Sequence, residues 1–394
     1  MNAIAGNSLG ERFLRTAFFQ HGVENAGWFE KMLITIYSVF SQLTLCPKLF
    51  DRERAERGLH SFVNLGAKAQ FVVPSDRQAS VHMMSLKAKD IKDRIERAGG
   101  LWQKIKIQDA DGQERSILAI LPPENCNTNW CALEDDLRRL WKKKNVVVDG
   151  IEREVIVTCE FADVLKEDDY HSKLFLHSNS AGVVSMMLTK RAAFYLGCMQ
   201  DICFFDPRGV WKSRGIASEG GYYNDIKAVY DEISEQYNPE NIWVTSACGG
   251  CPSAASLKTR VSRRVNFIFE SAFTKLADFR PGRFDRWCLR RYQKGVLSQD
   301  IEDAKKPKET SFGMEQLWEE HGFSDLGKVI VVSPVNDDRL DPHVSQKVED
   351  LVRRVNEHVL VVGFESEAKS THGDRYFKYI RPSALVCEYI FRKI

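Results

Sequence analysis

The chain has 394 residues, of which 43% are hydrophobic and 28% are charged, a composition typical of globular proteins. Its formal net charge is +2, so no chain-wide positive field indicates a nucleic-acid-binding protein, and none is expected. Ten cysteines are scattered along the chain, which excludes a short disulfide-dense secreted scaffold and favours a reducing compartment. The length fits one large domain plus an accessory region.

The N-terminal part, residues 10 to 98, is predicted to be helical. Apolar side chains recur every three or four residues between Phe29 and Phe40, and a charged helical run spans Asp90 to Arg97. We therefore assign residues 1–100 to a helical N-terminal region.

No secretory signal is predicted in the N-terminal region. Residues 1–11 lack the basic patch and apolar core of a secretory signal, so we expect a cytoplasmic protein or one delivered by a specialised secretion system. The apolar segment 32–45 is shorter than the ~20 residues of a transmembrane helix, so no membrane span is expected. It is interpreted as a helix packed on a core; the alternative is membrane-surface or partner contact by residues 29–46.

Two β-hairpins are predicted next. The first joins 103–108 to 116–121 around Asp111-Gly112, and the second joins 145–148 to 154–160 around Asp149-Gly150.

Strand-like and helical segments alternate over the remainder of the chain. This rhythm predicts an α/β fold with a mostly parallel sheet covered by helices on both faces. In such sheets the functional groups gather at the carboxyl ends of the strands. The predicted strands are Lys173–His177, Asp201–Asp206, Asn241–Ser246, Val265–Glu270, Lys328–Ser333 and His358–Gly363.

A sharp turn follows the strand Asn241–Ser246, and Cys248 stands at its tip. A strand that enters a helix through such a turn forms a nucleophile elbow when small residues flank the tip, and Ser246 and Gly250 meet this requirement. The following helix N-terminus favours a thiolate, and the N–H of Gly249 can bind an oxyanion. By itself the motif is weak, because cysteine is commonly a buried core residue.

Other polar motifs follow the neighbouring strands in chain order. They are His177-Ser178-Asn179, Asp206-Pro207-Arg208-Gly209, Asp337-Asp338-Arg339 and Thr371-His372-Gly373. Together with the elbow, this series resembles the α/β-hydrolase superfamily over residues 101 to 394. The order nucleophile, acid, histidine is the order that this fold uses. The helical N-terminus joined to such a domain is also similar to a 43 kDa protein family of chlamydiae, which adds no site residues.

The resemblance implies a catalytic triad of Cys248, Asp337 and His372, with Asp338 as the alternative acid. It also implies an oxyanion hole formed by Gly249 and the loop at Ser178 and Asn179. The chain departs from the family pattern, since Ser178 and Ser246 replace glycines and Cys248 replaces the serine. Hydrolases of the dienelactone-hydrolase type use a cysteine at this position. A shift of one residue would place Ala247 there and leave no nucleophile.

Between Lys258 and Lys294 basic residues outnumber acidic ones by eleven to three. The resemblance implies a helical cap near residues 275–327. We interpret the basic stretch as a solvated cap face, or alternatively as a site for an anionic ligand or a protein partner.

The expected activity is hydrolysis of an ester, thioester or similar acyl substrate through a covalent acyl-enzyme, without metal or cofactor. One alternative is a catalytically inactive binding or scaffold protein with the same fold. A minor alternative is a redox protein that uses Cys248 and Cys251 as a Cys-x-x-Cys pair, and Cys251 could also act as a resolving cysteine for Cys248.

Overall fold

The computed structural model describes residues 60–392 apart from 109–111, 149, 179–188, 209, 211, 216–218, 275–313, 315–326, 339, 341–342, 357, 369–370 and 372–374. The predicted N-terminal helix around residues 29–46 and nearly all of the predicted cap lie outside the described residues. Within the part of the chain that the structure describes, no helix is long and apolar enough to cross a membrane.

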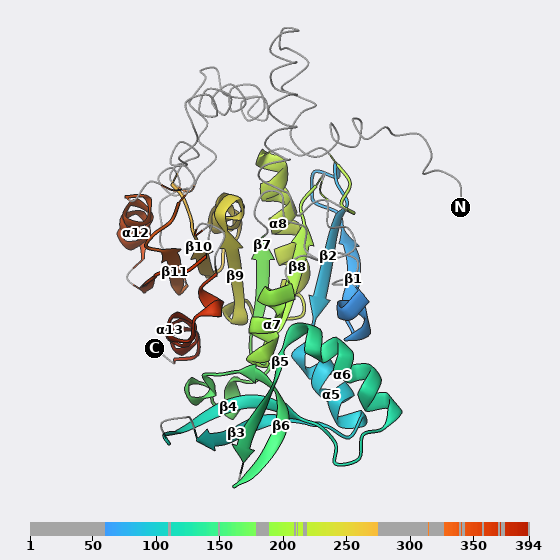
Figure 1. Cartoon of the computed structure of the whole chain (residues 1–394). Helices are drawn as coiled ribbons and strands as arrows, with labels where there is room; N and C mark the ends of the chain where they lie inside the picture. The colour runs from blue at the N-terminus through green and yellow to red at the C-terminus, as the bar shows by residue number, and fades with distance from the viewer. Residues whose placement is uncertain are drawn as a thin grey trace, which may run out of the picture.

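An eight-stranded sheet forms the centre of the molecule (Figure 1). Its strands are Lys68–Val72 (β1), Val81–Leu86 (β2), Leu174–Ser178 (β7), Asp201–Asp206 (β8), Ile242–Ala247 (β9), Asn266–Glu270 (β10), Val329–Pro334 (β11) and Val359–Phe364 (β12). They lie in the order β1-β2-β8-β7-β9-β10-β11-β12. β2 pairs antiparallel with β1 and with β8, and all other neighbours are parallel. This is the α/β-hydrolase fold that the resemblance implies, and all six predicted strands belong to it.

Helices cover both faces of this sheet, as predicted. They are Ala88–Arg97 (α5), Thr189–Gly197 (α7), Glu219–Ser234 (α8), Cys251–Arg260 (α9), Val344–Val355 (α12) and Ile380–Phe391 (α13). Successive side chains of a strand point to opposite faces, so Phe175 packs with the core of α5, α7 and α13, whereas Leu174 and Leu176 pack with the core of α8, α9 and α12. Short 3₁₀ helices span Ala162–Val164, Glu167–Asp169, Pro239–Asn241, Cys248–Gly250 and Tyr376–Lys378.

The predicted helical content of residues 10 to 98 is wrong between residues 68 and 86. This segment supplies β1 and β2, so the main sheet begins before residue 101, where we placed the start of the hydrolase domain. β2 is almost wholly buried, and a short apolar run of this kind does not distinguish a core strand from a buried helix. The charged run near Asp90 is helical as predicted and forms α5.

A second, four-stranded antiparallel sheet lies beyond one end of the main sheet (Figure 1). Its strands are Leu101–Gln108 (β3), Glu114–Leu121 (β4), Lys142–Val148 (β5) and Ile151–Cys159 (β6), and a helix, Thr128–Leu140 (α6), connects its two hairpins. The order is β3-β4-β6-β5, which confirms both predicted hairpins. The chain between β2 and β7 therefore forms a separate unit, which we call the small sheet.

Candidate active site

Cys248 occupies the tip of a sharp turn between β9 and α9. Its backbone φ is +48°, a left-handed conformation that is strained for a residue with a side chain, whereas Ala247 is extended with φ −138°. Ser246 and Gly250, two residues on either side, are buried. The strand, the left-handed tip and the helix together form the elbow that the spacing of small residues predicts. The tip residue is Cys248 and not Ala247.

The thiol of Cys248 is partly exposed and lies at the start of the ten-residue helix α9. A 3₁₀ turn, Cys248–Gly250, leads directly into this helix, whose first turn has backbone N–H groups without intrahelical partners. The positive end of the helix dipole favours an anion at such a position.

Cys251 has a different environment, although it is only three residues away. It is fully buried; Ser246 Oγ donates to its Sγ at 3.4 Å, and the thiol donates to the carbonyl oxygen of Glu270 at 3.7 Å. Burial raises the pKa of the Cys251 thiol far above its ordinary value. Both cysteines are free thiols, and the surroundings of Cys251 disfavour the thiolate that a resolving cysteine needs.

Three charged side chains lie beside the elbow, and sequence reasoning did not find them. Glu270 ends β10 and is paired in register with Ala247 of β9. Both of its oxygens bind the guanidinium of buried Arg191, with 2.9 Å between Nη2 and Oε2. The Nε of Arg375 lies 3.9 Å from the same carboxylate. A glutamate directly after the apolar residues 267–269 was the available signal.

Burial and the neighbouring charges shift the pKa values of both arginines. Burial lowers the pKa of Arg375, and the positive charge of Arg191 lowers it further, whereas Glu270 and the Cys248 thiol act in the opposite direction. Burial would also lower the pKa of Arg191, but Glu270 outweighs it and raises that pKa above its ordinary value. The carboxylate therefore holds two mostly buried cations next to Cys248.

His177 is buried beside this cluster, near the end of β7. Its Nδ1 lies 2.7 Å from Thr245 Oγ1 on the neighbouring strand β9. Burial, followed by the charges of Arg191 and Arg375, lowers the pKa of His177 well below its usual value, so the ring is neutral. These contacts fit a structural role for His177.

The predicted oxyanion-hole residues Ser178 and Asn179 are at the end of β7. Ser178 is the last residue of β7, is buried, and is paired in register with Ser246 at the base of the elbow. Asn179 lies outside the described residues. The strand end that carries this loop is thus adjacent to the elbow.

The predicted acid turn follows β11 and is tied to the loop after β12. Asn336 Nδ2 donates to Ser366 O at 2.9 Å, and Ser366 N–H donates to Asn336 Oδ1 at 3.0 Å. The hydroxyl of Thr371 accepts from the N–H of Asp338 at 2.8 Å and donates to Asn336 O at 2.6 Å. The residue directly before His372 is therefore fastened to the acid turn, although His372 itself lies outside the described residues.

The two candidate acids make different local contacts. Asp337 Oδ1 accepts from the N–H of Leu340 at 3.0 Å, whereas Asp338 Oδ1 lies 3.3 Å from the Thr371 hydroxyl. Both follow the same strand, and either could face the histidine loop.

The polar motif after β8 stabilises the scaffold. Arg208 is buried and binds Asp225 and Asp76, with 2.8 Å from its Nη2 to each carboxylate. Its backbone N–H also donates to Asp225, so this arginine joins the turn before β2 to α8. Among the residues that the structure describes, no three His, Cys, Asp or Glu side chains are grouped to hold a metal ion.

No known family model matches the chain, and no curated protein matches it. Among solved structures, it is similar to esterase LipW from Mycobacterium marinum, with 8% identity and a TM-score of 0.48 over 96% of this chain and 100% of that one. It is also similar to the esterase Pf2001 from Pyrococcus furiosus, with 14% identity and a TM-score of 0.37 over 75% and 91% of the two chains. A monoacylglycerol lipase from Paleococcus ferrophilus shows 14% identity and a TM-score of 0.40 over 56% and 95%.

Proposed function

We propose that the protein is a hydrolase that transfers the acyl group of an ester or thioester to water, with Cys248 as the nucleophile. The observation that carries this proposal is the left-handed backbone of Cys248 between β9 and α9. A strained residue of this kind persists only where the surrounding structure enforces it, and such strain is concentrated at functional sites. This backbone stands directly after β9, at the carboxyl edge of a parallel sheet, where functional groups of such folds gather.

In the first half of the reaction, His372 accepts the thiol proton and Cys248 sulfur attacks the carbonyl carbon of the substrate. A C–S bond forms, and the carbonyl oxygen becomes an oxyanion. The N–H of Gly249 and the loop at Ser178 and Asn179 donate to this oxyanion. His372 then gives its proton to the departing alcohol or thiol, which leaves a thioester on Cys248.

In the second half, His372 removes a proton from water as the water attacks the thioester carbon. The C–S bond breaks, the carboxylic acid departs, and Cys248 recovers its proton from His372. Asp337, with Asp338 as the alternative, orients His372 and stabilises its cationic form.

Two positively charged features of the structure lie near Cys248, where the reaction needs a thiolate. The guanidinium of Arg375 interacts electrostatically with the thiol, and the first turn of α9 adds the partial positive charge of a helix N-terminus. The ion pair to Glu270 keeps Arg375 in this place.

The rate of iodoacetamide alkylation at Cys248, measured from pH 5 to 9 by mass spectrometry, tests the proposal. The exposed thiols of Cys126 and Cys131 are internal references on the same molecule. We expect Cys248 to be labelled at pH 6 at least about tenfold faster than the references, since a free cysteine has a pKa of about 8.5. His372→Ala should remove this difference, and a panel of p-nitrophenyl esters and acyl thioesters would then identify the substrate class.

If Cys248 reacts at the rate of the references and ignores His372→Ala, the protein is not a cysteine hydrolase. That result would favour the alternative of an inactive α/β-hydrolase-fold binding protein.

A further inference from the structure

The small sheet curls around an apolar interior of its own. β3 and β5 are at opposite ends of its strand order, yet they lie in contact with each other. Side chains from β3, β4 and β6 that point to the inside of the curl form a separate buried cluster, which comprises Ile105, Ile107, Ile117, Ala119, Val155 and Val157. The small sheet is therefore a half-closed barrel with a core that the main sheet does not share.

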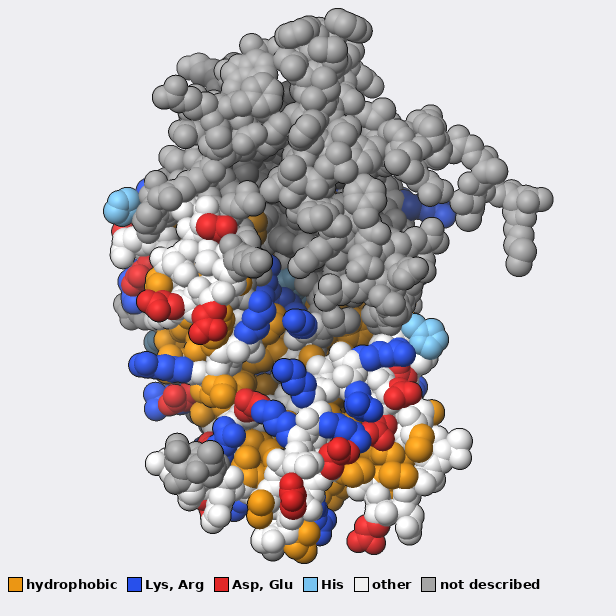
Figure 2. Space-filling view, in the orientation of Figure 1, with side chains coloured by type: hydrophobic (Ala, Val, Ile, Leu, Met, Phe, Trp, Pro, Cys, Tyr) orange, Lys and Arg blue, Asp and Glu red, His pale blue; other side chains and the backbone are white. Residues whose placement is uncertain are grey.

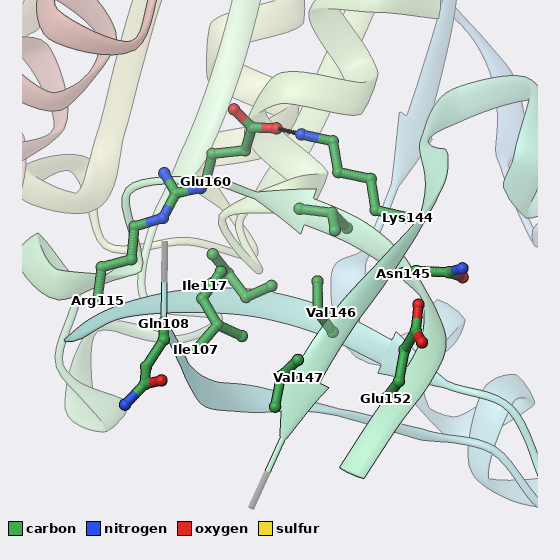
Figure 3. Close-up of a pocket in the computed structure, with 11 residues that line it drawn as sticks. Ile107, Gln108, Arg115, Ile117, Lys144, Asn145, Val146, Val147, Glu152 and Glu160 are labelled. Atoms are coloured by element: carbon green, nitrogen blue, oxygen red, sulfur yellow. Dashed lines mark hydrogen bonds and ion pairs between the residues drawn. The ribbon is translucent and has the colours of Figure 1, made fainter. Parts of the chain in front are cut away.

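A cavity of about 260 Å³ lies inside this curl (Figure 3). Ile107, Ile117, Val146 and Val157 supply apolar lining, and Arg115, Lys144, Glu152 and Glu160 supply charged lining. The volume is below the ~300–1,000 Å³ of sites for drug-sized molecules, so the cavity fits a smaller ligand.

The charged side chains around the cavity differ in whether they have an ion-pair or hydrogen-bond partner. Lys144 forms an ion pair with Glu160, so these two charges compensate each other (Figure 3). Glu152 is exposed and lies at the other end of the cavity from Arg115. Arg115 is half-buried, forms no ion pair with any described residue, and its Nε is a buried donor without a hydrogen-bond partner.

An unsatisfied buried donor is costly, and a charged one more so. The Arg115 guanidinium lines the cavity together with the apolar side chains of Ile107, Ile117 and Val157, so it is a binding point for an anionic oxygen. A guanidinium recognises a carboxylate well, because two parallel N–H groups match its two oxygens.

We propose that the small sheet binds a small monocarboxylate with a short aliphatic tail. The carboxylate accepts hydrogen bonds from Arg115, and the tail lies on Ile107, Ile117 and Val157. This site is separate from the elbow at Cys248, and the inference does not depend on the proposed hydrolase activity.

Octanoate is the probe, titrated into the full-length protein and followed by ligand-observed NMR. We expect saturable binding that Arg115→Gln weakens by about tenfold or more, the loss typical of a hydrogen bond to a charged group. Hexanoate should bind about tenfold more weakly than octanoate, because two methylene groups leave the apolar lining. Octylamine, with the opposite charge, should not bind.

The matched control is Arg153→Gln, which removes an exposed arginine from β6 of the same sheet and should leave octanoate binding unchanged. The titration is repeated on protein alkylated at Cys248. Alkylation should change octanoate binding at the elbow but not binding in the small sheet. Absence of saturable binding, equal effects of the two substitutions, or binding that depends on Cys248 alkylation but not on Arg115 would each overturn the proposal.

Discussion

The carboxyl edge of the main sheet and the cavity of the small sheet both contain arginine side chains that are at least half-buried, but only at the main sheet is their charge compensated by a carboxylate. At the main sheet, Glu270 compensates Arg191 and Arg375. In the small sheet, Arg115 forms no ion pair with any described residue, and Glu160, which lines the same cavity, pairs with Lys144. A compensated cluster holds a site rigid before any ligand arrives, whereas an uncompensated charge favours the arrival of a ligand with the opposite charge.

The largest expected effect is that of Glu270→Gln. The substitution leaves two mostly buried guanidinium groups without a counter-charge, and removal of one partner from a buried ion pair typically costs about 3–5 kcal/mol. Urea denaturation followed by circular dichroism measures the change in the free energy of unfolding.

Glu114→Gln is the control from the small sheet, since Glu114 pairs with Lys106 on the surface with side chains 62% and 75% exposed. An exposed pair of this kind contributes little to stability, so Glu114→Gln should lower the free energy of unfolding much less than Glu270→Gln. Equal losses from the two substitutions would contradict the distinction between the two regions.

The next effect is a pH dependence that arises from His177. Its folded pKa is depressed, so the folded state keeps the ring neutral while the unfolded chain takes up a proton below about pH 6.5. The contribution of His177 to the free energy of unfolding is therefore fully present above that pH. Below it, this contribution falls by up to about 1.4 kcal/mol per pH unit. His177→Gln should flatten the decline between pH 6.5 and 5, measured by urea denaturation at each pH. An unchanged slope would show that other groups cause it.

The sequence predicted the parallel strands of the main sheet because each is a short apolar run between helical segments, and it predicted the elbow because only small residues flank Cys248. β1 and β2 were missed for a physical reason. β2 is buried on both faces and shows no alternation, and four of the five residues of the edge strand β1 are exposed. Neither strand carries the period of two that reveals a half-buried strand.

The charged cluster beside the elbow could not be assembled from the sequence. Arg191 and Glu270 are 79 residues apart, and their contact depends on the register that places Glu270 beside Ala247. Such a register follows from the packing of the whole sheet rather than from any local motif.

A smaller effect is expected at the elbow itself. Glycine adopts a left-handed backbone without strain, whereas a residue with a Cβ at this conformation costs about 1–2 kcal/mol. Cys248→Gly should therefore be more stable than Cys248→Ala by about 1 kcal/mol in thermal denaturation, and neither should hydrolyse esters. Ala247→Gly is the matched control and should lose stability, because Ala247 is already in an unstrained extended conformation.

The smallest effect is expected for Arg115→Met. Unlike Glu270→Gln, it should leave the free energy of unfolding unchanged or raise it. Methionine keeps the apolar stem of the side chain and removes the buried Nε that lacks a partner. Without a carboxylate present, the free energy of unfolding should stay equal or rise by up to about 1 kcal/mol. With saturating octanoate the order should reverse, because a ligand stabilises only the protein that binds it. A loss of more than about 1 kcal/mol without ligand would mean that Arg115 stabilises the fold, and the contrast between the two regions would then fail.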